Sequence, residues 1–120
     1  LAARYQSEFT SRRERIAGYD AELAGLKQQI DKNQSILTSQ RADLDTQQSQ
    51  LDALRKSDAA AYNGLVSSYN RLVRVYNSLL EQTREDITRY NDIVEARNAI
   101  ALEERQLTQA LSAEGLPAAQ

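Results

Sequence analysis

Tyrosine–asparagine pairs recur at seven-residue intervals, and they are the residues of this sequence best suited to recognising a ligand. The pairs are Tyr62-Asn63, Tyr69-Asn70, Tyr76-Asn77 and Tyr90-Asn91. A ladder of exposed Tyr rings could bind a peptide or a glycan by stacking on its apolar faces. The interpretation that we favour is simpler. Each Tyr lies at the edge of a helix–helix interface with its hydroxyl at the rim, and each Asn faces solvent.

Side chains suited to catalysis are scarce. The chain contains no His and no Cys, which removes the commonest general base and the thiol nucleophile. The closest carboxylates, Asp43 with Asp45 and Glu103 with Glu104, would not converge on one point if the chain is helical. Glycine-rich phosphate loops and metal-binding spacings are also missing from the sequence. We therefore expect a protein that is not an enzyme and that needs no cofactor or metal.

The composition indicates long helices. Only 4 Gly and 1 Pro occur in 120 residues, so a fold that needs many turns is hard to build. The net charge of −2 gives no strong attraction to nucleic acid. No apolar run approaches the roughly 20 residues that cross a bilayer. We expect a protein partner, no nucleic acid, and no membrane insertion by this segment.

Apolar residues repeat every seven positions along almost the whole chain, which is typical of a coiled coil. The series comprises Phe9, Ile16, Leu23, Ile30, Leu37, Leu44 and Leu51, and it continues as Leu65, Leu72, Leu79, Ile93, Ile100 and Leu107. We predict that these residues form the helix–helix interface together with Tyr62, Tyr69, Tyr76 and Tyr90.

The residues that accompany this series change character near Lys56, close to the middle of the chain. In the first half the second interface position is partly polar, with Asn33, Gln40 and Gln47, and such buried polar residues often set the register. In the second half a third apolar position appears, which makes a broad face suited to more than one neighbour. It comprises Val66, Val73, Leu80, Ile87, Val94 and Ala101.

We predict an all-α fold, an antiparallel two-helix coiled-coil hairpin. The first helix would span residues 1–56, the turn 57–60, the second helix 61–114 and a C-terminal tail 115–120. Ser57 or Asp58 could cap the second helix, and Gly115 followed by Pro117 would end it. The alternative is one continuous helix in a parallel coiled coil, because the turn has no Gly or Pro and the Ala residues at 59–61 favour a helix.

A fold near residue 58 makes the partners of many side chains predictable. The expected pairs are Leu44 with Leu72, Gln40 with Tyr76, Gln47 with Tyr69, Asn33 with Thr83, Tyr19 with Arg97, Arg12 with Glu104 and Leu111 with Tyr5. We expect the amides of Gln40 and Gln47 to reach the phenol hydroxyls. Tyr19 with Arg97 would be a cation–π pair.

The segment Tyr69-Asn70-Arg71-Leu72-Val73-Arg74-Val75-Tyr76-Asn77 resembles the coiled-coil stalks of bacterial envelope proteins. The resemblance extends over about residues 62–112 and implies an extracytoplasmic spacer between a membrane anchor and a distal domain. The architecture also resembles the helical hairpins of periplasmic adaptor proteins, whose tips dock a partner channel. The corresponding docking tip here would be Arg55, Lys56, Ser57 and Asp58.

We therefore expect a non-catalytic coiled-coil spacer or oligomerisation module of a larger protein, which the resemblance places in the bacterial cell envelope. The broad second-half face suggests self-association into a dimer or a four-helix bundle. A partner-docking hairpin that uses its tip and a filament-forming rod are the alternatives. Because Leu1-Ala2-Ala3 offers no N-cap, we expect the first helix to continue upstream in that protein.

Overall fold

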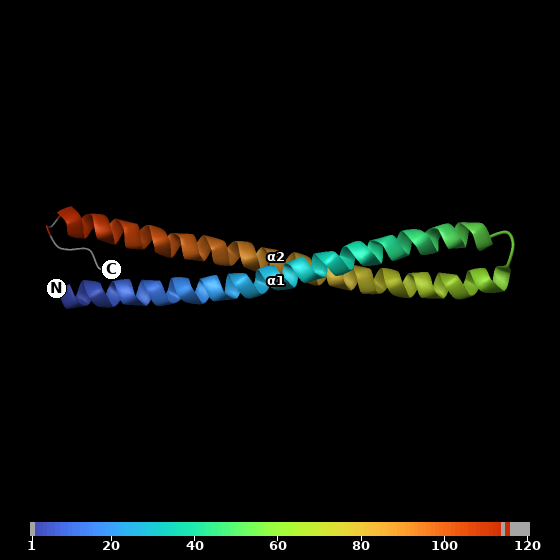
Figure 1. The fold of residues 1–120 in the computed structure, drawn as a ribbon, viewed down its shortest axis with the longest axis horizontal. Helices are drawn as coiled ribbons and strands as arrows, with labels where there is room; N and C mark the ends of the chain where they lie inside the picture. The colour runs from blue at the N-terminus through green and yellow to red at the C-terminus, as the bar shows by residue number, and fades with distance from the viewer. Residues whose placement is uncertain (1, 114, 116–120) are drawn as a thin grey trace. The chain divides into compact units, whose positions relative to one another are not determined.

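The computed structural model describes residues 2–113 and residue 115, and it consists of two long helices. Helix α1 spans Ala2–Leu54 and helix α2 spans Ala59–Ala113. They run in opposite directions and pack against each other, and no strand occurs among the described residues (Figure 1). The predicted all-α helical hairpin is confirmed, and the alternative of one continuous helix is wrong. Supercoiling of the two helices stays a prediction.

The hairpin turn falls at residues 55–58, two residues earlier than the sequence suggested at both of its ends. The backbone N–H groups of Ser57 and Asp58 both donate to the carbonyl oxygen of Leu54, each at 3.1 Å, which closes α1. A carboxylate oxygen of Asp58, Oδ1, accepts a hydrogen bond of 3.0 Å from the N–H of Ala61. Asp58 is therefore the N-cap of α2. Its carboxylate accepts a hydrogen bond from a free N–H group of the first turn, which the Ala side chains after it cannot do.

The C-terminal end of α2 carries the predicted glycine signal. Gly115 has a φ of +76°, the left-handed conformation that Gly adopts without a steric penalty, and its N–H donates to the carbonyl of Ser112 at 3.1 Å. The last described residue of α2 is Ala113. The expected helix end at residue 114 and the remainder of the tail at 116–120 lie outside the described residues.

Contacts between the two helices divide the chain into two units, which we describe separately. The terminal unit comprises Leu1–Lys27 with Thr88–Gln120, and the turn unit comprises Gln28–Ile87. In each unit one stretch of α1 lies beside one stretch of α2 (Figure 1). The terminal unit pairs the blue and the orange-to-red segments, and the turn unit pairs the cyan-to-green and the yellow-green segments.

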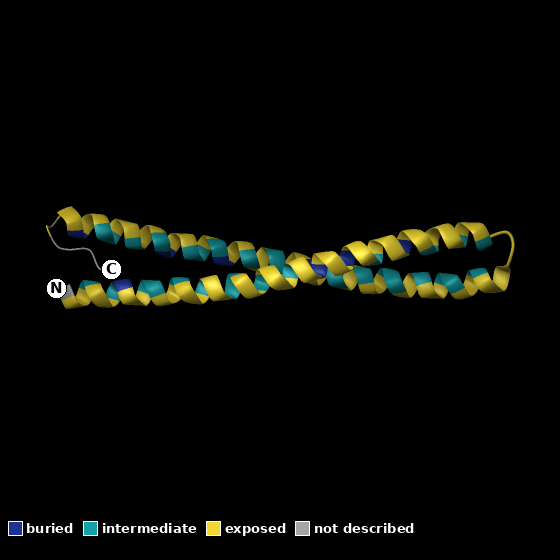
Figure 2. Cartoon of the chain, viewed as in Figure 1, coloured by how far each residue is buried: buried dark blue, intermediate teal, exposed yellow. Residues whose placement is uncertain are grey.

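Few side chains are fully buried in either unit (Figure 2). The buried apolar residues of the terminal unit are Phe9, Ile93, Ile100 and Leu111, and those of the turn unit are Leu37 and Leu44. Two packed helices can bury only one narrow face each, because the rest of each helix surface meets no second layer. The core is therefore a thin seam, and most of each helix faces outward.

We expect Asp58→Ala to lower the free energy of unfolding by about 1 kcal/mol, because the N–H of Ala61 loses its acceptor. Asp58→Asn should retain most of that stability, since an Asn side chain caps a helix comparably well. The measurement is urea unfolding followed by circular dichroism at one fixed protein concentration. Asp52→Ala is the matched control, because it removes an exposed carboxylate near the turn that caps no helix. Equal destabilisation by both Ala variants would contradict the capping role.

Candidate interaction surface

The structure places every predicted interface residue at a buried or half-buried position. Phe9, Leu37, Leu44, Ile93 and Ile100 are buried, and Ile16, Leu23, Ile30, Leu51, Leu65, Leu72, Leu79 and Leu107 are half-buried. Tyr62, Tyr69, Tyr76 and Tyr90 are half-buried as well. A stacking ladder would need the Tyr rings exposed, whereas here each ring lies partly under its neighbours at the edge of the seam.

Ion pairs join the helices near the start of α1, with partners that differ from the expected ones. The sequence suggested Arg12 with Glu104, but Nε of Arg12 lies 3.4 Å from Oε2 of Glu103, and Nε of Arg13 lies 3.6 Å from Oε1 of Glu104. Arg12 also lies 3.8 Å from Glu8 on its own helix. Two adjacent Arg and two adjacent Glu residues allow this exchange of partners, because either set of pairs leaves each Arg beside a carboxylate.

Arg97 illustrates a competition between an aromatic ring and a carboxylate. We expected it to stack on Tyr19, but its guanidinium donates hydrogen bonds to both carboxylate oxygens of Asp20. A charge-assisted bidentate contact is stronger than a cation–π contact at an exposed site, which explains why Arg97 binds Asp20 rather than Tyr19. The hydrogen bond from Arg97 to Asp20 and the charge of Asp20 raise the pKa of the guanidinium. Arg89 and Glu22 form a second cross-helix pair in the same unit.

A polar layer interrupts the seam of the turn unit at Asn33 and Thr83, which expose only 2% and 3% of their surfaces. Asn33 Oδ1 accepts a hydrogen bond of 2.9 Å from Gln29 Nε2, and Thr83 Oγ1 donates one of 2.7 Å to the carbonyl of Leu79. The second half of the Asn33 amide, Nδ2, is buried and has no hydrogen-bond partner among the described residues. Burying that donor unpaired lowers stability.

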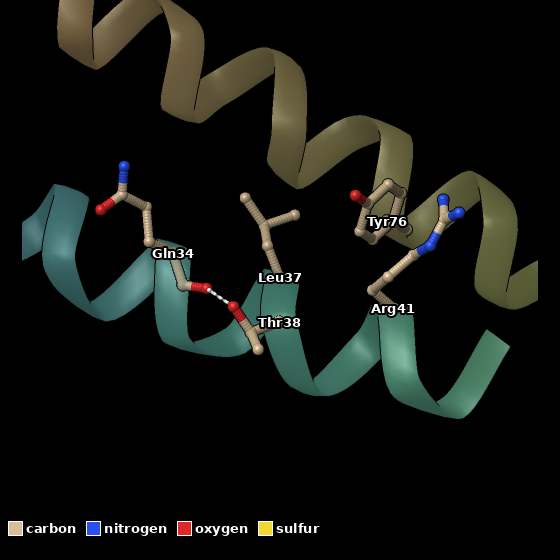
Figure 3. A pocket seen from close by; sticks show the side chains of 5 residues that line it. All are labelled: Gln34, Leu37, Thr38, Arg41 and Tyr76. Atoms are coloured by element: carbon tan, nitrogen blue, oxygen red, sulfur yellow. Dashed lines mark hydrogen bonds between the residues drawn. The ribbon is translucent and has the colours of Figure 1, made fainter. Parts of the chain in front are cut away.

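The expected amide–phenol hydrogen bonds of Gln40 and Gln47 do not form. The Oε1 atoms of both are buried and accept no hydrogen bond from any described residue, which includes Tyr76 and Tyr69. In Figure 3 the Tyr76 hydroxyl points toward Leu37 of α1.

A shallow groove of about 550 Å³ opens between the helices of the turn unit. Gln34, Leu37, Thr38 and Arg41 of α1 and Tyr76 of α2 line it (Figure 3). Thr38 is occupied by a 2.9 Å hydrogen bond to the carbonyl of Gln34, and Arg41 lies 3.6 Å from Asp45. The guanidinium of Arg41 and the phenol of Tyr76 lie beside the apolar side chain of Leu37, and such a groove can accommodate a side chain of another molecule. The side chains that line it include neither a general base nor an activated nucleophile.

The broad face predicted for the second half forms a stripe along α2 in the turn unit. This stripe, which we call the α2 stripe, consists of Val66, Val73, Leu80 and Ile87, and all four are half-buried. Tyr76 lies three residues after Val73 and four before Leu80, so it shares their face and the groove adjoins the stripe. Only one flank of the stripe meets α1, because the seam is centred on Leu72 and Leu79.

Exposed apolar residues also occur on the opposite flank, and heptad reasoning missed them. Val75 is 49% exposed and Ile36 is 37% exposed. Val75 lies two residues after Val73, about 200° around the helix, so the two Val side chains point to opposite flanks of the seam. The spacing of Val73 and Val75, two residues apart, does not fit one helix face, and it could have indicated from the sequence that Val75 is exposed.

The four residues of the expected docking tip, Arg55, Lys56, Ser57 and Asp58, are all exposed. Two of them are occupied by the turn itself. Asp58 caps α2, and Ser57 Oγ donates to the carbonyl of Ala53 at 3.1 Å. The side chains of Arg55 and Lys56 are therefore the part of the tip that is available to a partner.

Further findings bear on the kinds of site that this chain can carry. Neither helix has a stretch apolar and long enough to cross a bilayer, as far as the chain is described. Within the same residues, no three acidic side chains gather where they could hold a metal ion. Comparisons with family models, with curated proteins and with solved structures found no match for this chain. The surface of the hairpin is therefore what indicates a function for this chain.

We expect Asn33→Leu to raise the free energy of unfolding by about 1 kcal/mol, because it replaces a buried, half-satisfied amide with an apolar side chain. Thr83→Val is the matched control and should change stability little. The hydroxyl that it removes bonds only to the carbonyl of its own helix. Urea unfolding at fixed protein concentration measures both. A clear loss of stability in Asn33→Leu would show that the amide has a partner that stabilises the seam.

Proposed function

We propose that this chain is a non-catalytic helical spacer that self-associates through the α2 stripe and forms part of a larger protein. One observation carries the proposal. After the hairpin has folded, Val66, Val73, Leu80 and Ile87 are still only half-buried. An apolar row of this length beside an open groove favours a further helical layer, because burying each aliphatic side chain completely contributes favourable free energy.

The exposed area of the chain supports the same proposal. The chain exposes 8334 Å². A compact monomer of 13.5 kDa would expose about 6,500 Å². The excess of roughly 1,800 Å² is comparable to the area that a standard protein–protein interface buries in total. Association of two hairpins into a four-helix bundle would cover part of this excess and supply the second layer that each helix lacks.

The arrangement of functional groups favours a structural role over a chemical one. The groove is open, and the five side chains that line it include no carboxylate that could act as a general base. The Tyr-Asn repeats resemble those of bacterial envelope stalks, which agrees with a spacer between other domains. That resemblance alone supports the placement in the cell envelope.

Docking through the hairpin tip is the second candidate function. Arg55 and Lys56 are adjacent, exposed cations at the turn, and neither forms an ion pair with a described residue. Such a pair suits an acidic partner surface. Replacing both with Ala while Asp58 is retained would separate docking from folding, because Asp58 caps α2.

We expect sedimentation equilibrium to show a reversible dimer whose population rises with protein concentration. Val73→Lys should shift the chain to monomer, because a Lys in the α2 stripe places a charge in the apolar contact. Val75→Lys is the matched control. It makes the same change two residues away on the opposite flank and should leave the dimer intact. Circular dichroism of both variants checks that the hairpin still folds.

Two outcomes would overturn the proposal. One is a wild-type chain that stays monomeric at high concentration. The other is a folded Val73→Lys variant that dimerises as well as the wild type.

A further inference from the structure

We propose that a partner protein docks an acidic amphipathic helix on the flank of the turn unit opposite the α2 stripe, with a carboxylate beside Arg74. This surface, which we call the second flank, comprises Ile36 of α1 and Arg74, Val75, Ser78, Leu79 and Gln82 of α2. All six residues lie in the turn unit. The inference goes beyond the proposed self-association, because it assigns a different surface to a different partner.

A hollow of about 420 Å³ lies on the second flank, lined by its five α2 residues. Arg74, Ser78 and Gln82 follow one another in steps of four residues, and so do Val75 and Leu79. Side chains four residues apart form a ridge along a helix surface, and the space between two ridges can receive a ridge of a second helix. The hollow lies between two neighbouring ridges of α2, a shape that suits a helical partner.

Exposed aliphatic side chains give the second flank its apolar part, which Val75 and Ile36 contribute. The ion pair of Arg89 with Glu22 shows which heptad positions meet across the two helices. Val75 precedes Arg89 by two heptads. Ile36 follows Glu22 by two heptads, so in an antiparallel pair it borders the seam on the same flank as Val75. Covering both side chains with a partner helix would bury apolar area, which is favourable.

The polar side chains around the hollow have no partner within the described part of the chain. Arg74 forms no ion pair there, and Ser78 and Gln82 form no side-chain hydrogen bond. In the groove beside the α2 stripe, by contrast, Nε of Arg41 already lies 3.6 Å from a carboxylate oxygen of Asp45. Available hydrogen-bond donors beside apolar side chains favour a partner that brings acceptors.

The α2 side of the second flank is positively charged. Residues 59–80 of α2 include two cations, Arg71 and Arg74, and no acidic residue. Asp43 of α1 lies one heptad from Ile36 and forms no ion pair with either Arg. A carboxylate on a partner helix would therefore gain a charge-assisted contact with Arg74. Nucleic acid is disfavoured, because two cations beside aliphatic side chains provide few of the phosphate contacts that such binding needs.

Peptide binding to the intact chain, measured by fluorescence anisotropy, tests the inference. The probe is a labelled helical peptide of Leu, Ala and Glu, with Leu on one face and Glu along the edges of that face. A second probe carries Lys in place of each Glu. We expect the Lys probe to bind about tenfold more weakly at low salt, and the difference should shrink at high salt. Equal binding of the two probes, or no binding of the Glu probe, would overturn the inference.

A charge reversal tests the place of the carboxylate. Arg74→Glu should weaken binding of the Glu probe about tenfold, because it sets a like charge beside the incoming carboxylate. Arg105→Glu is the matched control, since it makes the same charge change at an exposed position of the terminal unit, and it should leave the dissociation constant unchanged. Equal weakening by both variants would show that net charge attracts the probe, and the inferred site would be wrong.

An apolar substitution distinguishes the second flank from the α2 stripe. Val75→Ser should weaken binding of the Glu probe, because it removes an aliphatic contact of the hollow, whereas Val73→Ser makes the same change on the α2 stripe and should not. Circular dichroism checks that both variants fold. The opposite result would place the probe on the α2 stripe and overturn the inference.

Sedimentation equilibrium separates this inference from the proposed self-association. If Val75→Lys loses the dimer, a second copy covers the second flank, and the inferred acidic partner is wrong. If the wild-type chain is monomeric and still binds the Glu probe through Arg74 and Val75, the proposed self-association fails and the second flank stands as a docking site.

Discussion

The narrow apolar seam between two antiparallel helices is the constraint on which the rest of this structure depends. A helix in contact with a single neighbour buries one stripe of side chains, and here that stripe is set by one apolar residue in every seven. Phe9, Ile93 and Ile100 fill it in the terminal unit, and Leu37 and Leu44 fill it in the turn unit. Because the seam is thin, every further apolar residue beside it must remain partly exposed or find a second layer.

Polar groups give the seam its register and direction. Asp58 starts α2 at a defined residue, since its carboxylate accepts the N–H of Ala61. The buried layer of Asn33 and Thr83 stays aligned, because any slip of one helix would bury a polar group against an apolar one. Cross-helix pairs such as Arg97 with Asp20 then add charge complementarity at the rim. Specificity in this hairpin thus comes from polar groups, whereas cohesion comes from the apolar ones.

The proposed function depends on the apolar surface of the turn unit that the seam does not cover. The α2 stripe and the adjoining groove form an apolar surface in the turn unit, bordered by neutral amides and by charges of both signs. Surfaces of this kind pack against other helices. The side chains that approach the groove offer hydrogen bonds and one cation, and they lack the paired acid and base that catalysis needs. The proposed spacer, paired with a copy of itself, would use all of these features.

The sequence by itself favoured the helical hairpin over one continuous helix, placed the turn to within two residues, limited the cap of α2 to Ser57 or Asp58, and indicated the end of α2 at Gly115 and the residues of the seam. These features depend on local chemistry and on a seven-residue period, both of which can be read along one chain. Tertiary structure decided the individual partners of the side chains. Arg97 binds Asp20 rather than Tyr19, Gln40 Oε1 accepts no hydrogen bond from Tyr76, and Val75 remains exposed. The physical reason is that such choices depend on distances and directions within about one side-chain length, and a heptad pattern specifies only which face of a helix a residue occupies.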